Sequence, residues 1–424
     1  MKQCDIAIIG AGTTGLAAAL FLHADGHPVS IFEQFDTPKP LGAGLMLQPT
    51  GLACLAALGL DASVVENSRK IHDIDGRTTA GRRVLDIGYG ELGPGIFGLG
   101  VHRATLFETL YHAVRDAGIA LHTSARMEST GSDDKGRHLI DQAGKRHGPF
   151  ELVIDASGAR SRIREAHADI RYVRPYPYAA VWGVCRQTDD WPWPDTLTQR
   201  FRTAQNMLGV LPIGRRPGSE KNDLAFFWSL RARDYDAWRA RGVREWQAEV
   251  AAYWPEAGKL AAQFTSVDDL TFATYPDVVL NRCDGDKLVF LGDAAHATSP
   301  QLGQGANLAL ADALELAHAI RAATVMPDAL RDFARRRKNH VRFYQIASRY
   351  LTPFFQSDSR LAPLIRDWTF APMTRIPYMR REMVRTLAGI KTGLFTSLDP
   401  GKWDPAYGIG QGARPLSPFL RGEG

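Results

Sequence analysis

A strand, a glycine-rich turn and a helix open the chain, and this opening constrains the fold more than any other feature. Residues 6–9 are apolar and predict a buried strand, GAGTTG follows at 10–15, and an apolar helix begins directly after it. A G-x-G-x-x-G turn between a strand and a helix is the dinucleotide-binding fingerprint. Gly10 allows the tight turn, Gly12 lets a pyrophosphate approach the backbone, and Gly15 lets the helix pack on the strand.

An acidic residue follows this turn at the spacing that a bound nucleotide requires. Glu33 closes the next strand, residues 29–32, about twenty positions after the turn, where a carboxylate binds a ribose hydroxyl. The alternative interpretation is a glycine-rich turn that binds nothing. Because strand, helix and acid all stand in place, they favour a ligand and predict an α/β, Rossmann-like domain.

A second glycine-flanked helix start lies within residues 288–316. A buried strand stops at a Gly-Asp pair, a proline rigidifies the next loop, and GQG at 303–305 leads into a helix with leucines at helical spacing. The start of a helix presents backbone N–H groups and the positive end of the helix dipole to open space. We expect a flat, electron-rich group there, and a reduced flavin, which is anionic at its pyrimidine end, fits this description.

The two motifs together resemble those of the group A flavoprotein monooxygenases, the FAD-dependent aromatic hydroxylases of the para-hydroxybenzoate hydroxylase type. The resemblance covers roughly residues 4–350. It implies FAD as cofactor, NADH or NADPH as co-substrate, and a flavin C4a-hydroperoxide, formed with O2, that hydroxylates or epoxidises an apolar aromatic or polycyclic small molecule. Two alternatives stay open: an FAD-dependent reductase or oxidase on the same fold, and a non-catalytic flavin-binding protein.

The resemblance also implies roles for individual residues. Arg103, at a helix start, matches an arginine that contacts FAD, and Asp293 would hold the ribityl hydroxyls. The N–H groups of Ala306 and Asn307 would stabilise negative charge on the flavin, with Pro300 near its reactive edge. The expected cofactor-binding residues are Gly10, Gly12, Thr14, Gly15, Glu33, Gly44, Arg103, Gly292, Asp293, Gly305, Ala306 and Asn307, and the expected catalytic residues are Pro300 and Gly303.

The chain departs from the family at two places. Members commonly carry a basic residue where this chain has Gly42, in a GAG stretch that passes close to the isoalloxazine ring. They also carry Asp-Gly where this chain has Ser157-Gly158, and Asp155 lies two positions earlier in a strand at 151–155. Because serine carries no charge, this second departure bears on the nicotinamide step and leaves FAD binding expected.

Aromatic residues accumulate in the middle of the chain, among apolar segments that predict an antiparallel sheet with covering helices. The strands are expected at 179–186, 197–201, 207–211 and 223–230, and the helices at 235–241 and 243–253. We interpret this region as a substrate domain whose sheet roofs the flavin. The candidate substrate residues are Met207, Leu208, Leu211, Phe226 and Trp228. The alternative is that these side chains form core, as aromatic strand residues often do.

These features divide the chain into three parts. The FAD-binding domain is expected at 1–170 and 275–350, the inserted substrate domain at 171–274, and a helical segment with a loose tail at 351–424. Residues 71–87 are expected to form a hairpin that turns at Asp75-Gly76. His296 is expected to pack behind its loop.

Positive charge is concentrated near the C-terminus. Residues 331–385 contain 13 Lys and Arg against 4 Asp and Glu, so that the rest of the chain carries −4 of the net +5. This local excess argues against a nucleic-acid partner for the whole protein. Apolar residues such as Trp368 and Ile376 lie among these arginines. The segment could cap the substrate entrance, form a homodimer in place of a monomer, contact anionic lipid, or simply pack on the core.

Composition excludes several classes of protein. The four cysteines are far apart and have no metal-ligand spacing, so neither a disulfide framework nor a metal site is expected. A reducing cytoplasm is the expected compartment. No apolar run approaches the length of about eighteen residues that spans a bilayer, and the first strand begins too early to leave room for a signal peptide.

Overall fold

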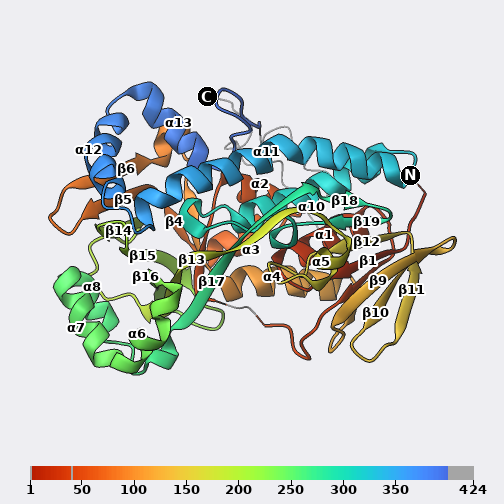
Figure 1. Ribbon diagram of the computed structural model, residues 1–424, viewed down its shortest axis with the longest axis horizontal. Coiled ribbons are helices and arrows are strands. Elements are labelled where there is room, and N and C mark those ends of the chain that lie inside the picture. Colours follow the sequence, from red (N-terminus) through yellow and green to blue (C-terminus); the bar gives the residue numbers. More distant parts are fainter. Residues whose placement is uncertain (1, 40–41, 400–424) are drawn as a thin grey trace.

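The computed structural model describes residues 2–39 and 42–399, which form two main sheets with helices around them (Figure 1). The first sheet has the strand order β18-β19-β12-β1-β2-β8 and is parallel except at β18. Its strands are β1 (Ile6–Ile9), β2 (Val29–Phe32), β8 (Ala120–His122), β12 (Leu152–Asp155), β18 (Asp284–Gly285) and β19 (Leu288–Phe290). The expected Rossmann-like sheet is confirmed.

Both faces of the first sheet are covered by other elements. Strand residues point alternately to the two faces, and each face carries apolar side chains. Ile6, Ile8 and Ile31 face helices that include α1 and α10, whereas Ile9 and Phe32 face a small sheet of order β11-β10-β9. The elements of this half are α1 (Thr13–Ala24), α2 (Pro49–Ala57), α3 (Asp61–Glu66), α4 (Arg103–Asp116), α5 (Arg162–His167), α9 (Asp293–His296), α10 (Gly305–Ala322), β9 (Met127–Asp133), β10 (Gly136–Asp141) and β11 (Arg146–Phe150).

The second sheet has seven strands in the order β17-β13-β16-β15-β14-β5-β6. One face packs under the helices α6 to α8, and the other faces a three-stranded sheet of order β3-β7-β4. The elements are β3 (Gly44–Leu47), β4 (Arg69–Ile71), β5 (Asp73–Thr78), β6 (Arg83–Gly88), β7 (Gly98–His102), β13 (Asp169–Arg186), β14 (Thr196–Arg202), β15 (Asn206–Arg215), β16 (Asn222–Arg231), β17 (Thr271–Arg282), α6 (Tyr235–Arg241), α7 (Val243–Tyr253) and α8 (Pro255–Ala261).

The hairpin of β5 and β6 differs from the expectation in two respects. The chain turns after Thr78 rather than at Asp75-Gly76, which lie inside β5 and pair with β6. A Cβ on Gly76 would come within 2.8 Å of the Phe201 ring, so this glycine serves close packing and makes no turn. The hairpin also pairs in parallel with β14. It therefore belongs with the second sheet, although the sequence-based division placed it in the FAD-binding domain.

Three helices follow α10. Helix α11 (Met326–Phe355) crosses the top of the molecule in Figure 1, and α12 (Ala362–Thr374) and α13 (Pro377–Leu387) pack beside β5 and β6. None of the helices in the described ranges combines the length and the apolar content that crossing a membrane requires. The loose tail expected at the C-terminus falls on residues 400–424, which lie outside the described residues.

Candidate functional site

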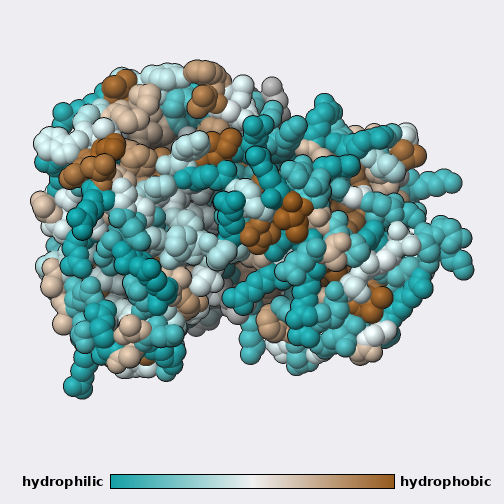
Figure 2. All heavy atoms as spheres, viewed as in Figure 1, coloured by the Kyte–Doolittle hydropathy of each residue, from teal (hydrophilic) through white to brown (hydrophobic). Residues whose placement is uncertain are grey.

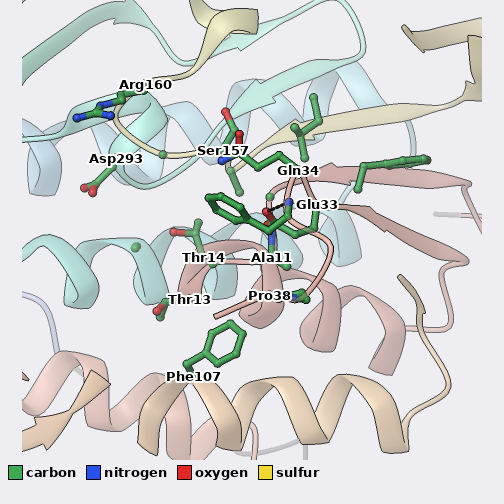
Figure 3. A pocket seen from close by; sticks show the side chains of 18 of the residues that line it. Ala11, Thr13, Thr14, Glu33, Gln34, Pro38, Phe107, Ser157, Arg160 and Asp293 are labelled. Carbon is green, nitrogen blue, oxygen red and sulfur yellow. Dashed lines mark hydrogen bonds between the residues drawn. The ribbon is translucent and has the colours of Figure 1, made fainter. Parts of the chain in front are cut away.

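A cavity of about 710 Å³ lies between the β1–α1 turn and the start of α10 (Figure 3). Its walls come from segments that are far apart in the sequence, including the end of β2, the start of α4 and the loop after β12. The expected site residues that line it are Gly10, Gly12, Thr14, Glu33, Arg103, Asp293, Gly305 and Ala306. The expected cofactor-binding and catalytic residues outside its lining are Gly15, Gly44, Gly292, Asn307, Pro300 and Gly303, and none of the five candidate substrate residues belongs to the lining.

The glycine turn is closely packed at two positions and open at the third. Gly10 has a φ of +100°, and a Cβ on it would come within 2.7 Å of the carbonyl oxygen of Ala156. A Cβ on Gly15 would come within 1.9 Å of the carbonyl oxygen of Gly10, so no side chain fits between the turn and α1. By contrast, a Cβ on Gly12 would meet no protein atom within 4 Å. Gly12 therefore leaves space on the cavity side, which suits a ligand that approaches the backbone.

The acidic residue after β2 is held in a fixed position at the cavity wall. The buried carboxylate of Glu33 accepts hydrogen bonds from the backbone N–H groups of Ala11 at 2.7 Å and Phe35 at 3.0 Å (Figure 3). These two bonds orient the carboxylate beside the turn. It stands where an acidic residue accepts the ribose hydroxyls of a bound nucleotide.

The second motif faces the same cavity. Asp293 begins α9, is exposed, and lines the cavity together with Gly305 and Ala306 at the start of α10. The first backbone hydrogen bond of α10 runs from Leu308 N–H to the carbonyl oxygen of Gln304. The N–H groups before Leu308 therefore have no partner within the helix, and with the dipole they favour a negatively charged group.

Asn307 acts through its side chain on the neighbouring loops. Its buried amide oxygen accepts a hydrogen bond from Gln48 N–H at 2.8 Å, and its amide nitrogen donates to the carbonyl oxygens of Met46 at 3.2 Å and Gly303 at 2.9 Å. Gly303 ends a short 3-10 helix, Pro300–Leu302. Asn307 thus fixes the loop that carries both expected catalytic residues against the end of β3.

Two of the expected cofactor-binding glycines have packing neighbours that explain them. A Cβ on Gly44 would come within 2.6 Å of Ile213 and 2.7 Å of Ala225, both on the second sheet. A Cβ on Gly292 would come within 2.5 Å of the Thr14 hydroxyl. Each glycine therefore allows two segments around the site to approach closely.

Asp155, which lies two positions before the Ser-Gly pair, does not reach the cavity. It is fully buried and accepts hydrogen bonds from the Ser157 N–H at 3.0 Å, the Ser157 hydroxyl at 2.5 Å and the Ser161 hydroxyl. Burial raises its pKa, and these hydrogen bonds and Arg164 act in the opposite direction. Asp155 thus shapes the loop after β12, while Ser157 and Gly158 of that loop line the cavity.

A buried polar network lies behind the second motif. Asp312 of α10 accepts hydrogen bonds from His296 at 2.6 Å, from Gly292 N–H at 2.8 Å and from Arg337 of α11 at 2.6 Å. Burial alone would raise the pKa of Asp312, but the charges of His296 and Arg337 and the hydrogen bonds hold it well below its usual range. His296 therefore packs behind its loop, as expected from the sequence.

The network continues towards the C-terminal helices. Arg337 donates a hydrogen bond to Nδ1 of His340 at 2.5 Å, which leaves Nε2 to donate to the carbonyl oxygen of Gly389 at 2.7 Å. Burial, followed by the charge of Arg337, lowers the pKa of His340 to about 3. A neutral His340 therefore connects the cofactor side of the molecule to the segment after α13.

The candidate substrate residues divide between two faces of the second sheet. Leu208, Phe226 and Trp228 pack into the cluster under α6 to α8. Met207 and Leu211 lie on the opposite face, where Leu211 packs with residues of the three-stranded sheet and Met207 packs with Phe355 at the end of α11. The expectation that all five roof one site is wrong, because neighbouring strand residues point to opposite sides.

Several cavity residues were not expected from the sequence. Phe107 lies one helical turn after Arg103 on α4, a spacing that could have indicated it, and Lys39, Arg126, Arg160 and Arg162 add positive charge to the lining. Arg126 and Arg162 both pair with Glu128. Lys39, Arg126 and Arg160 lie outside helices and strands, Arg162 begins α5, and only the fold brings them together.

Comparisons with known proteins agree with this geometry. Residues 3–342 match the family model of the FAD binding domain. The probable 2-heptyl-3-hydroxy-4(1H)-quinolone synthase of Rhodococcus erythropolis is 27% identical over 79% of this chain and 84% of its own. The 3-amino-4-hydroxybenzoate 2-monooxygenase of Streptomyces cremeus is 26% identical over 74% of this chain and 78% of its own.

The crystal structure of Klebsiella pneumoniae HpxO complexed with FAD and uric acid has the same fold. It superposes with a TM-score of 0.77 at 21% identity and covers 90% of this chain and 97% of that chain. The family model spans most of this chain and both glycine motifs. This chain therefore belongs to the FAD binding domain family, as an FAD-dependent monooxygenase of the aromatic hydroxylase type.

Proposed function

We propose that this monooxygenase uses NADH or NADPH and O2 to hydroxylate an apolar aromatic or polycyclic small molecule. The observation that carries the proposal is that both glycine motifs line one cavity. The second sheet adds aromatic side chains on the face opposite α6 to α8. When FAD is bound, it supplies the redox chemistry, by accepting a hydride from the nicotinamide and passing one oxygen atom of O2 to the substrate.

The residues of the cavity suit FAD along its length. The open space at Gly12 admits a pyrophosphate, and the carboxylate of Glu33 is oriented to accept ribose hydroxyls. Asp293 stands beside the start of α10, where it would accept hydrogen bonds from ribityl hydroxyls. The N–H groups of Ala306 and Asn307, at the positive end of α10, would stabilise negative charge at the pyrimidine end.

Aromatic residues on the inward face of the second sheet support an aromatic substrate. The rings of Trp182 and Phe227 lie 5.0 Å apart, on the same face as Met207 and Leu211. The names of the relatives also describe ring compounds, a quinolone and an aminohydroxybenzoate. We infer that the substrate ring packs among these side chains, since offset stacking and apolar contact favour a flat ring.

Tyr275 of β17 is the polar group best placed to orient such a ring. Its hydroxyl oxygen accepts a hydrogen bond from the Trp182 ring nitrogen at 2.7 Å, and its own proton can then be donated to a substrate oxygen. Burial raises the pKa of Tyr275 to about 12. The phenol therefore stays protonated at neutral pH, as a donor must.

The test is a turnover experiment with labelled dioxygen. Protein loaded with FAD would be given NADH or NADPH and, in turn, a quinolone, a hydroxybenzoate and urate. We expect one ring compound to accelerate nicotinamide oxidation and to gain one labelled oxygen atom, which mass spectrometry detects. A product that gains hydrogen without oxygen would contradict the proposal and indicate a reductase, and stoichiometric peroxide with an unaltered ring would indicate an oxidase.

A further inference from the structure

The outer side of α12 carries an apolar stripe. Leu361, just before the helix, and Leu364, Ile365 and Trp368 within it are 69%, 56%, 50% and 67% exposed. Their spacing of three, four and seven positions places them on one side of the helix. Brown, hydrophobic atoms gather over the α12 and α13 region at the upper left of Figure 2. We call these four residues the α12 face.

The opposite side of α12 is already occupied. The Phe370 ring lies 5.4 Å from that of Phe354 and 5.9 Å from that of Phe355. Arg366 is fully buried and donates hydrogen bonds to the carbonyl oxygens of Thr203 and Phe354 at 3.0 Å. These contacts fix the rotation of the helix, so the α12 face cannot turn inward without breaking them.

Arg82 contacts the α12 face, and three further exposed arginines lie near it in the sequence. The guanidinium of Arg82 stacks over the Trp368 ring at 4.1 Å from its centroid, and Arg360, Arg375 and Arg381 are exposed nearby in the sequence. Neighbouring arginines pair with carboxylates, as Arg380 does with Glu91 and Arg385 with Glu382. Among the described residues, no carboxylate lies within ion-pair distance of these four arginines.

We propose that the α12 face docks on an anionic lipid surface, with the apolar stripe at the level of the acyl chains and the arginines at the phosphates. An exposed tryptophan and leucines flanked by unpaired arginines are typical of a helix that lies in the membrane interface. The 13 residues of α12 are too few to span a bilayer, so the helix lies on the surface. The proposal is independent of the substrate and of the reaction.

The arginines distinguish lipid from a second copy of the chain. In a two-fold dimer the same patch meets itself, so the unpaired charges of Arg82, Arg360 and Arg375 would be brought towards a surface that carries the same unpaired positive charges. Lipid phosphates supply the missing negative charge. Charge complementarity therefore favours the membrane as the occupant of this face.

The test is a vesicle flotation experiment with the full chain and FAD bound. We expect binding to vesicles of phosphatidylcholine mixed with phosphatidylglycerol, little binding to phosphatidylcholine alone, and release by salt because screening weakens the attraction. Trp368→Gln should weaken binding by roughly tenfold because it removes buried apolar area. Arg360→Gln and Arg375→Gln should each weaken it by about fivefold.

Matched controls lie elsewhere on the surface. Val325→Gln removes a 50% exposed apolar side chain at the start of α11, and Arg244→Gln removes an exposed cation on α7. Neither should change binding. The proposal is overturned if anionic vesicles bind no better than neutral ones, or if the controls weaken binding as much as Trp368→Gln does. It is also overturned if the protein forms a dimer that Trp368→Gln dissociates, since a second copy would then occupy the face.

Discussion

Gly12 of the β1–α1 turn and Gly209 of β15 both lack a side chain, but their surroundings differ. A Cβ on Gly12 would meet no protein atom within 4 Å, whereas a Cβ on Gly209 would lie 2.0 Å from the Phe227 ring. The first half of the molecule leaves this space open at a cavity, and the second half fills it with an aromatic ring. A glycine therefore marks a ligand site only when the fold leaves its surroundings empty.

The two halves also differ in what stabilises them. Behind the cavity, Asp312 and Arg337 form a buried ion pair that His296 and His340 extend. Under α6 to α8, the second sheet is held by packed rings, such as Phe226 against Trp246 at 5.6 Å. A directional polar network holds a loop in one geometry, whereas aromatic packing supplies non-directional burial.

The largest effect is expected from Asp312→Asn in the polar half. Loss of the carboxylate charge leaves Arg337 buried without a counter-ion, which should lower the free energy of unfolding by about 3–5 kcal/mol. Because the pKa of Asp312 is held below its usual range, its contribution is present above about pH 4 and is lost as the pH falls further. Urea unfolding of the FAD-free protein at several pH values measures both effects.

The control for this prediction is Asp332→Asn on α11. Asp332 pairs with the partly exposed Arg336, so its loss should cost less than about 1 kcal/mol. Equal destabilisation by the two variants would show that the buried network is no more important than a surface pair.

Gly12→Val should separate ligand binding from folding. The valine side chain has room in the protein but occupies the space that a pyrophosphate needs, so FAD affinity should fall by roughly a hundredfold, or about 3 kcal/mol. The melting temperature of the FAD-free protein should stay unchanged. Gly131→Val on β9, which also meets no protein atom within 4 Å, is the matched control and should keep its FAD. A yellow Gly12→Val protein with full FAD occupancy would contradict the assignment of this turn.

Gly209→Ala should have the opposite pattern. The added methyl group displaces the Phe227 ring, and overpacking of this kind costs about 1–3 kcal/mol. FAD affinity should be unchanged because Gly209 lies outside the cavity lining. Thermal unfolding and FAD titration of the same preparation measure both quantities. Loss of FAD without loss of stability would mean that the two glycines do not differ as proposed.

Tyr275→Phe should have the smallest effect. It removes the hydroxyl that we propose donates to the substrate, at a cost of about 1.5 kcal/mol, and should raise KM by roughly tenfold. Tyr172→Phe on β13 is the control, since its hydroxyl bonds to Asp277 at 3.2 Å and has no proposed contact with the substrate. An unchanged KM in Tyr275→Phe would assign the orientation of the substrate to another group.

The sequence predicted the two motifs that are formed by residues close together in the chain. Each glycine motif contains its own strand, turn and helix start, so the residue order alone places Gly12 and Ala306 on the correct elements, whereas the short helix α9 that Asp293 begins was not expected. The same reasoning was wrong for Gly76, because glycines that serve packing and glycines that make turns look alike without their neighbours. It also missed Arg126, which reaches the cavity from a loop that carries no motif, and Arg160, which follows the Ser157-Gly158 pair.

The sequence could not predict which face of the second sheet each strand residue occupies, for a related reason. Residues 207–213 of β15 and 223–230 of β16 are buried throughout. A strand that is covered on both sides has no alternation of polar and apolar residues to show which side faces which partner. Leu208 and Leu211 look equivalent in the sequence, although one lies under the helices and the other faces the three-stranded sheet.

By itself, the sequence determined that this protein contains a dinucleotide-binding turn, a second helix start suited to an anionic group, and an aromatic antiparallel sheet. These depend on spacing over a few residues, which the chain carries wherever it folds. Only the tertiary structure decided that both motifs line one cavity, that Asp312 and Arg337 meet behind it, and that the α12 face points to solvent. Such contacts join residues distant in sequence, and packing between whole elements is what brings them together.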